Sequence, residues 1–238
     1  EGTRHGRRKL VSTTVDPQSL HLAVDFGASS GRVIAGTFNG ATLEIEEVHR
    51  FLNEPLNTHE ALTWDYNTLV HEMMTGLRHG HDIADARAQQ VATIGVDTWG
   101  VDFGLLDETG ELMGPPVHYR DDRTKGMMET VFAEDCPADD IFAATGIQFM
   151  VLNTLYQLAA LRRQAPDTLA RARHLLMMPD LFHRHLTGSM VGEVTNASTT
   201  QLFDPRAGDW SDALIARLKL PRAIFPRLVK PGSSLGPL

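Results

Sequence analysis

The sequence predicts an α/β fold, with a mixed sheet and helices flanking it. Three observations support this prediction. Short β-rich runs joined by tight turns open the chain, an amphipathic segment follows them, and a continuous apolar run comes next. This order is that of an antiparallel meander connected by a crossover helix to a parallel strand. From residue 122 onward the pattern becomes mainly helical.

Three strands are expected at the start of the chain, over residues 20–25, 32–38 and 43–51. Residues 27–31 and 39–41 separate them. The second turn contains Asn39-Gly40, and Asn-Gly between apolar runs is a strong signal for a β-hairpin. We therefore expect these strands to form a three-stranded antiparallel meander.

A helix and two further strands follow the meander. The helix is predicted over residues 65–78, because apolar side chains recur there at helical spacing: Leu69, Val70, Met73, Met74 and Leu77. Residues 91–96 form a continuous apolar run, which is typical of a strand buried on both faces. Residues 101–106 predict another strand, and a turn closes it.

The rest of the chain combines helices with one more strand. We expect helices over residues 153–163, 166–171, 180–186 and 212–218, a buried strand over residues 174–178 and a loop over residues 204–209. Gly188 ends the third of these helices. Residues 226–238 are rich in Pro and Gly and predict a linker.

Composition narrows the possible functions. The chain has 238 residues, 42% of them hydrophobic, which suits one large domain or two small ones. Its formal net charge of −8 argues against binding to nucleic acid or to an anionic membrane. The single cysteine, Cys136, excludes an intramolecular disulfide and fits a reducing cytoplasm. Residues 1–19 are basic and poor in apolar residues, and we interpret them as a flexible lead-in.

The first motif follows the first predicted strand. Asp25 ends this strand, and the turn Gly27-Ala28-Ser29-Ser30-Gly31-Arg32 leads into the next. Glycine allows a backbone to approach an anion, and hydroxyl and N–H groups supply hydrogen-bond donors. The motif therefore predicts a β-hairpin that wraps a nucleotide phosphate. The alternative is a solvated hairpin turn, because Gly and Ser are ordinary turn residues.

The second motif is Asp97-Thr98-Trp99-Gly100-Val101-Asp102. Trp99 offers a flat apolar face to a sugar ring, Gly100 exposes its backbone, and the carboxylates accept hydrogen bonds from hydroxyl groups. The alternative is a buried Trp in a turn between strands, with two Asp residues that cap the turn.

Together with three further strings, these motifs resemble the amino-terminal domain of FGGY-type carbohydrate kinases. The strings are V-H-Y-R-D-D-R-T at residues 117–124, N-T-L-Y-Q-L at 153–158 and E-V-T-N-A-S-T-T-Q-L at 193–202. The resemblance covers residues 20–238. It implies an actin-like ATPase (ribonuclease H-like) fold, which the order of the predicted elements also suggests. Residues 20–230 would form the sugar-binding domain, and residues 231–238 a linker toward the C-terminal domain of the same protein.

The resemblance also implies cofactors and site residues. ATP would bind through the hairpin, at Ala28, Ser29, Ser30, Gly31 and Arg32. Asp25 would match the carboxylate that orients Mg²⁺ through water. The substrate-binding positions would be Gly100, Trp99 and Asp102. Gly100 would contact the sugar through its backbone, and Trp99 and Asp102 would shape the pocket.

Within the family, D-T-W-G-V-D-F and T-N-A-S-T-T-Q favour transfer of the γ-phosphoryl group to the 1-hydroxyl of L-rhamnulose. The family's general base is an Asp in a His-Asp-Thr string that this sequence lacks. We therefore expect no catalytic base in this chain, and an inactive chain on its own. Two alternatives stay open: another FGGY kinase for a ketose or polyol, and a non-catalytic actin-fold module that binds sugar or nucleotide. The sequence does not determine the oligomeric state.

Overall fold

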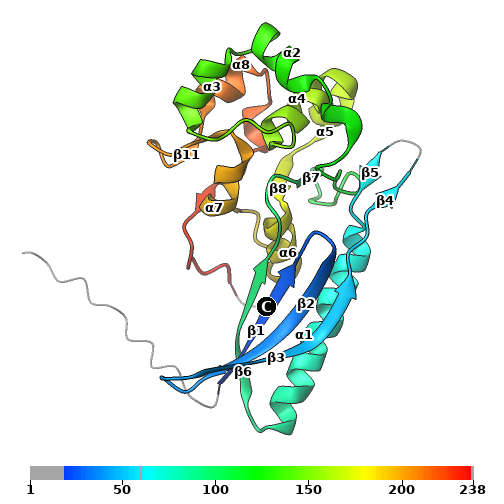
Figure 1. Ribbon diagram of the computed structural model, residues 1–238, viewed down its shortest axis with the longest axis vertical. Helices are drawn as coiled ribbons and strands as arrows, with labels where there is room; N and C mark the ends of the chain where they lie inside the picture. The colour runs from blue at the N-terminus through cyan, green and yellow to red at the C-terminus, as the bar shows by residue number, and fades with distance from the viewer. Residues whose placement is uncertain (1–18, 59–60, 237–238) are drawn as a thin grey trace, which may run out of the picture.

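The computed structural model describes residues 19–58 and 61–236. Its central feature is a four-stranded sheet in the order β3-β2-β1-β6 (Figure 1). The strands are β1 (Ser19–Phe26), β2 (Ser30–Phe38), β3 (Leu43–Leu52) and β6 (Gln90–Asp97). β1, β2 and β3 are antiparallel neighbours, and β6 pairs with β1 in parallel. The mixed sheet and its meander confirm the predicted α/β class.

Helix α1 (Tyr66–Ala86) packs against one face of this sheet (Figure 1). It continues eight residues beyond the predicted end. Its interior glycines allow this close packing: a Cβ at Gly76 would lie 2.3 Å from Cγ2 of Val33, and one at Gly80 would lie 2.5 Å from Cδ2 of Leu22. A glycine in a helix lowers its stability, but here it lets the backbone approach the sheet.

Strand β6 is not buried on both faces, so that prediction was wrong. Ala92, Thr93 and Gly95 are exposed, and Val91 and Ile94 are half-buried. The reason is that one face of the strand alone meets the core: Val91, Ile94 and Val96 pack against it, and the residues between them face the other side. An apolar run in sequence does not reveal whether a second layer covers the strand.

The second half of the chain forms a helical region around the antiparallel pair β7 (Phe103–Leu106) and β8 (His174–Met177). The helices that follow one another here are α2 (Met127–Glu134), α3 (Ala138–Thr145), α4 (Thr154–Gln164), α5 (Pro166–Arg171), α6 (Met178–Thr187), α7 (Val194–Ala197) and α8 (Asp212–Arg217). The 3₁₀ turns are η1 (Asp122–Thr124), η2 (Ser198–Thr200) and η3 (Arg222–Ile224). The predictions for α4, α5, α6 and α8 are confirmed to within two residues.

The remaining strands are two residues long. They are β4 (Leu56–Asn57), β5 (Leu62–Thr63), β9 (Gly192–Glu193), β10 (Phe203–Asp204), β11 (Asp209–Trp210) and β12 (Leu228–Val229). Two of the pairings correct the sequence analysis. β10 and β11 form a small hairpin where a loop was predicted, and β12 pairs in parallel with β9 inside the predicted linker. Residues 1–18 of the predicted lead-in lie outside the described residues.

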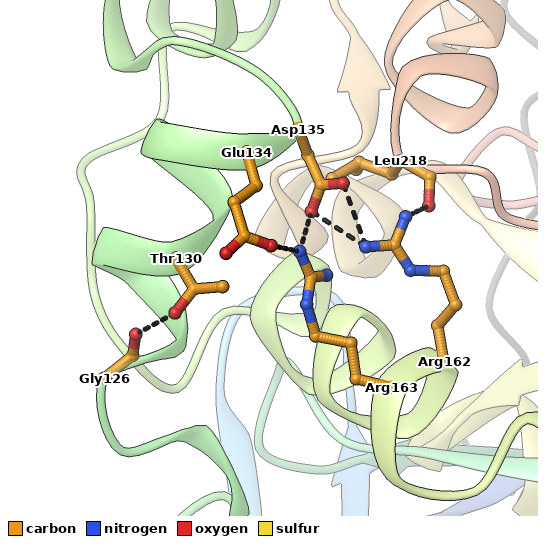
Figure 2. A network of polar contacts seen from close by, with 7 residues as sticks. All are labelled: Gly126, Thr130, Glu134, Asp135, Arg162, Arg163 and Leu218. Atoms are coloured by element: carbon orange, nitrogen blue, oxygen red, sulfur yellow. Dashed lines mark hydrogen bonds and ion pairs between the residues drawn. The ribbon is translucent and has the colours of Figure 1, made fainter.

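A polar network centred on the buried carboxylate of Asp135 joins α2, α4 and the end of α8 (Figure 2). The carboxylate of Asp135 accepts hydrogen bonds from Nη2 of Arg162 at 2.9 Å, and Nη2 of Arg163 also lies 2.9 Å from it. Arg163 contacts Glu134 as well, and Nη1 of Arg162 donates to the Leu218 carbonyl. One carboxylate thus joins two consecutive arginines of α4 to the end of α2, away from the central sheet.

Among the described residues, no helix is both long enough and apolar enough to cross a membrane.

Candidate functional site

The two sequence motifs meet at the same edge of the central sheet. β1 and β6 are parallel, and their register places Asp25 directly opposite Asp97 at their carboxyl ends. The hairpin turn follows β1, and the Trp99 loop follows β6. In open α/β sheets, ligands bind in the crevice outside the carboxyl ends of the strands. The edge that carries both motifs is therefore the candidate functional site.

The hairpin between β1 and β2 has a short, exposed tip. Phe26 pairs with Gly31, and the Gly27 N–H donates to the carbonyl oxygen of Ser30 at 3.0 Å. Ala28 and Ser29 at the tip are exposed. The backbone of the tip and the hydroxyl of Ser29 are therefore accessible to an anion.

At both glycines of the hairpin, Gly27 and Gly31, there is no room for a side chain. A Cβ at Gly31 would lie 2.2 Å from Cζ of Phe51, whose ring belongs to the buried core under the sheet. A Cβ at Gly27 would lie 2.8 Å from the Ser30 carbonyl oxygen. A larger residue at either position would push the turn away from its observed path.

Asn53 braces the hairpin from the neighbouring strand. Its Nδ2 donates to the Gly27 carbonyl oxygen at 2.8 Å, and its backbone N–H donates to the Ser29 carbonyl oxygen at 3.1 Å. The side chain is almost fully buried. Sequence reasoning did not find Asn53, because its role arises only when β3 returns alongside β2.

The charged groups at this edge are Asp25, Asp97 and Arg32. Nη2 of Arg32 lies 3.0 Å from Oδ2 of Asp25, and Nε of Arg32 is buried without a hydrogen-bond partner. Asp97 is exposed. The sequence analysis counted Asp97 among the carboxylates of the second motif that could accept hydrogen bonds from sugar hydroxyl groups, but it did not assign Asp97 a role beside the hairpin.

This arrangement fits ATP with Mg²⁺. Magnesium is usually held by one or two carboxylates, with water and phosphate oxygens completing its ligands. Asp25 and Asp97 supply two carboxylates beside the hairpin. The described residues contain no group of three His, Cys, Asp or Glu side chains arranged to hold a metal. Two carboxylates beside the hairpin fit a hydrated cation that arrives with phosphate oxygens.

Asp102 lies at the centre of a buried aromatic cluster. Its Oδ2 accepts hydrogen bonds from Nε1 of Trp64 at 2.7 Å, from Nε1 of Trp99 at 3.1 Å and from the backbone N–H of Tyr119 at 3.1 Å. Its Oδ1 accepts a hydrogen bond from Nε2 of Gln157 at 3.0 Å. The Asp102 side chain is 0% exposed, so it acts on the site through the groups that it holds.

Burial raises the pKa of Asp102 to about 6, although the four hydrogen bonds that it accepts oppose this rise. The carboxyl group is therefore mostly ionised at neutral pH. Burial also lowers the pKa of His118 to about 4, and its neutral ring stacks on Trp64 at a centroid distance of 4.0 Å. Trp64 in turn packs against Trp99, with the ring centroids 3.9 Å apart and the rings tilted by 32°. These contacts fix the orientation of the Trp99 indole.

A hollow of about 380 Å³ opens beside Trp99 and Gly100. Its lining is predominantly apolar. The lining residues are Trp99, Gly100, Val101, Tyr119, Ile147, Met150, Leu152, Asn153 and Thr199. The structure thus brings Trp99 and Gly100 to a pocket, as the sugar interpretation requires. Tyr119, Asn153 and Thr199 lay in strings that sequence reasoning singled out without assigning these residues a role.

Comparison with known proteins identifies a family. The model of the N-terminal domain of the FGGY family of carbohydrate kinases matches residues 20–238. A rhamnulokinase of Pectobacterium atrosepticum is 46% identical over 217 residues, covering 90% of this chain and 43% of that protein. A rhamnulokinase of Oceanobacillus iheyensis is 42% identical over 221 residues, covering 93% of this chain and 46% of that protein. The chain spans less than half the length of these relatives.

Solved structures show the same fold. A xylulose kinase from Lactobacillus acidophilus superposes with a TM-score of 0.78 at 16% identity, over 90% of this chain and 43% of that one. A carbohydrate kinase from Novosphingobium aromaticivorans superposes with a TM-score of 0.74 at 26% identity, over 90% of this chain and 44% of that one. A glycerol kinase from Plasmodium falciparum, solved with ADP, superposes with a TM-score of 0.71 at 16% identity, over 92% of this chain and 44% of that one. The predicted actin-like fold is confirmed.

Proposed function

The chain belongs to the FGGY family of carbohydrate kinases, and from this premise we propose that it is the sugar-binding N-terminal part of an ATP-dependent ketose kinase. Its reaction is the transfer of the γ-phosphoryl group of ATP to the 1-hydroxyl of L-rhamnulose. The curated relatives named above are rhamnulokinases at more than 40% identity, which favours this ketose over other substrates of the family.

One observation carries the proposal for the sugar: the apolar pocket that Gly100 and Trp99 line. L-rhamnulose is a 6-deoxy sugar, so one end of it is a methyl group. Ile147, Met150 and Leu152 offer that methyl group an apolar surface, and Trp99 offers a flat face to the ring. A glycerol or pentulose kinase has no methyl group to accommodate.

The hairpin would bind the phosphates of ATP. Phosphoryl transfer depends on positioning and on neutralising charge, with little covalent help from the protein. The tip at Ala28 and Ser29 would approach the phosphate oxygens, and Arg32 would neutralise their charge. Asp25 and Asp97 would hold hydrated Mg²⁺, which neutralises charge on the phosphates when it is bound. Trp99 and Gly100 would orient the ketose toward the hairpin.

Other steps of the reaction would need residues outside this chain. In the family, the general base lies in a His-Asp-Thr string, which this sequence does not contain. A second hollow, of about 730 Å³, lies between β6, α6 and residues 230–236. We place the C-terminal domain of the same protein on this side, over the exposed face of β6. The phosphoryl donor is ATP, so the protein would act in the cytoplasm.

The test is direct binding of two ketoses to this chain. L-rhamnulose and L-fructose differ only by the 6-hydroxyl group. We expect L-rhamnulose to bind roughly 10- to 100-fold more tightly, because the apolar pocket offers no partner to that hydroxyl group. Isothermal titration calorimetry measures both affinities. Equal affinities, or no binding of either ketose, would contradict the proposed substrate.

A second measurement tests whether the general base lies outside this chain. We expect the isolated chain to release no ADP from ATP and L-rhamnulose in a coupled assay, because loss of a general base alone typically costs 10²- to 10⁴-fold in rate. Turnover at about 10 s⁻¹, an ordinary rate for an enzyme, would overturn the assignment of the base to a region outside this chain.

A further inference from the structure

The loop that carries Gly100 has a strained backbone. Val101, a β-branched residue, adopts φ 68°, in the left-handed region where such residues are rare. The N–H of Asp102 donates to the Gly100 carbonyl oxygen at 2.9 Å. A bond from residue i+2 to residue i around a central residue of positive φ is a classic γ-turn, which is rare and strained. Such strain persists only where the surroundings impose it.

Side chains from two other elements impose this turn. The hydroxyl of Thr199 accepts a hydrogen bond from the Val101 N–H at 3.1 Å. On the other side of the same residue, Oγ1 of Thr154 donates to the Val101 carbonyl oxygen at 2.6 Å, and Nε2 of Gln157 lies 3.3 Å from it. The backbone N–H and the carbonyl oxygen of Val101 are thus both hydrogen-bonded by residues distant in sequence. A Cβ at Gly100 would lie 3.0 Å from the Thr199 side chain, so the contact is close.

The segment that contains Thr199 also holds the other part of the pocket lining. Nε2 of Gln201 donates to the Ile147 carbonyl oxygen at 3.0 Å, and Oε1 of Gln201 accepts a hydrogen bond from Nδ2 of Asn153 at 3.0 Å. Gln201 is fully buried and itself adopts φ 61°. One short segment therefore contacts both the Gly100 loop and the segment that contains Ile147 and Asn153.

From this arrangement we propose that Thr199 and Gln201 are positioning residues that set the geometry of the ketose pocket. Thr199 holds the γ-turn that directs the Gly100 backbone, and Gln201 holds the segment around Ile147. In this role, neither residue contacts the reacting atoms of the sugar. This inference rests on the proposed function, because it takes the ketose as the ligand of the pocket.

The substitution Thr199→Val tests the inference, because it keeps the shape of the side chain and removes its hydroxyl group. The Val101 N–H then loses its acceptor. We expect the affinity for L-rhamnulose to fall roughly tenfold, the effect of an unsatisfied donor of ordinary strength. The Val101 amide should also exchange its hydrogen with deuterium faster. Thr199→Ser keeps the hydroxyl group and should restore both properties.

A neighbouring threonine supplies the matched control. Thr200 is fully buried, and its hydroxyl group bonds only within its own segment, to Ala197 and Leu202. Thr200→Val should lower stability without changing the affinity for L-rhamnulose or the exchange of the Val101 amide. Gln201→Met, which removes both contacts of the carboxamide, should weaken binding while leaving the Val101 amide protected.

The outcomes separate the two proposals. If the unmodified chain does not bind L-rhamnulose, the proposed function fails, and the inference fails with it. If the unmodified chain binds and Thr199→Val binds equally well, the proposed function stands and the positioning role of Thr199 is overturned. Equal loss of affinity in Thr199→Val and Thr200→Val would also overturn it, because the effect would then be one of general stability.

Discussion

The hairpin that follows β1 and the loop that follows β6 lie at the same edge of the sheet but are built in opposite ways. The hairpin has regular β geometry, an exposed tip and one brace, Asn53. The loop has a strained residue at Val101 and a carboxylate, Asp102, buried beneath it that accepts four hydrogen bonds. A phosphate can bind to an accessible backbone that local turn chemistry forms. A sugar ring needs fixed walls, which only contacts with distant residues provide.

The largest expected effect comes from removing the buried carboxylate of the loop. Asp102→Ala removes the acceptor of three donors at the buried cluster, Nε1 of Trp64, Nε1 of Trp99 and the N–H of Tyr119. We therefore expect the free energy of unfolding to fall by about 4 kcal/mol. Unfolding in urea, followed by circular dichroism, measures it. Asp25→Ala is the matched control at the hairpin. The Asp25 side chain is 42% exposed, and its ion pair contributes less than ~1 kcal/mol. Similar losses of unfolding free energy in the two variants would contradict the contrast between a loop held by distant residues and a locally formed hairpin.

The pH dependence of stability should also come from the loop. Burial raises the pKa of Asp102 to about 6 from its ordinary value of 3.8, so in this pH range the folded protein binds more protons than the unfolded chain. The contribution of this group to stability is complete below pH 3.8 and is lost as the pH rises through 6. We expect the free energy of unfolding to fall by about 3 kcal/mol from pH 3 to pH 8, relative to Asp102→Asn.

Urea unfolding at a series of pH values, for the unmodified chain and for Asp102→Asn, gives this difference directly. Taking the difference removes the effect of the other carboxylates, which titrate in both proteins. A difference that does not change with pH would show that Asp102 keeps an ordinary pKa when it is buried.

A smaller effect is expected in the hairpin. Gly31→Ala places a methyl group against the buried ring of Phe51, and overpacking of this kind typically costs about 2 kcal/mol. The turn must also shift, so binding of ATP should be lost, and calorimetry with ATP measures this loss. Gly95→Ala in β6 is the control, because a Cβ there meets nothing within 4 Å. Unchanged ATP binding by Gly31→Ala would exclude the hairpin as the phosphate site.

Sequence reasoning was most successful where structure is local. It predicted the three-stranded meander, the hairpin at residues 27–31 and four of the later helices. It did not find that β6 is open on one side, because an apolar run looks the same whether or not a second layer covers it. It also placed the start of β7 at Val101, because a β-branched residue favours a strand, whereas the hydrogen bonds from Thr154 and to Thr199 hold this residue in a turn.

The candidate site divides in the same way. The hairpin and the turn at Gly100 were visible as strings of residues, and the resemblance to a family assigned them roles that remain predictions. Trp64, Gln157, Thr199 and Gln201 had no assigned role, since each contacts the Gly100 loop or the pocket lining across a large separation in sequence. No local pattern marks a residue whose partner lies in another element.

The sequence by itself determined the order of the strands of the central sheet, helix α1 and four later helices, the turn residues of the hairpin, and the family. These follow from short-range turn chemistry, apolar spacing and recognisable motifs. Only the tertiary structure decided that Asp25 stands opposite Asp97, that Asp102 is buried, and that Thr199 and Gln201 together hold the pocket. The physical reason is that a strained turn and a buried carboxylate are stable only when groups from several distant elements satisfy them at once.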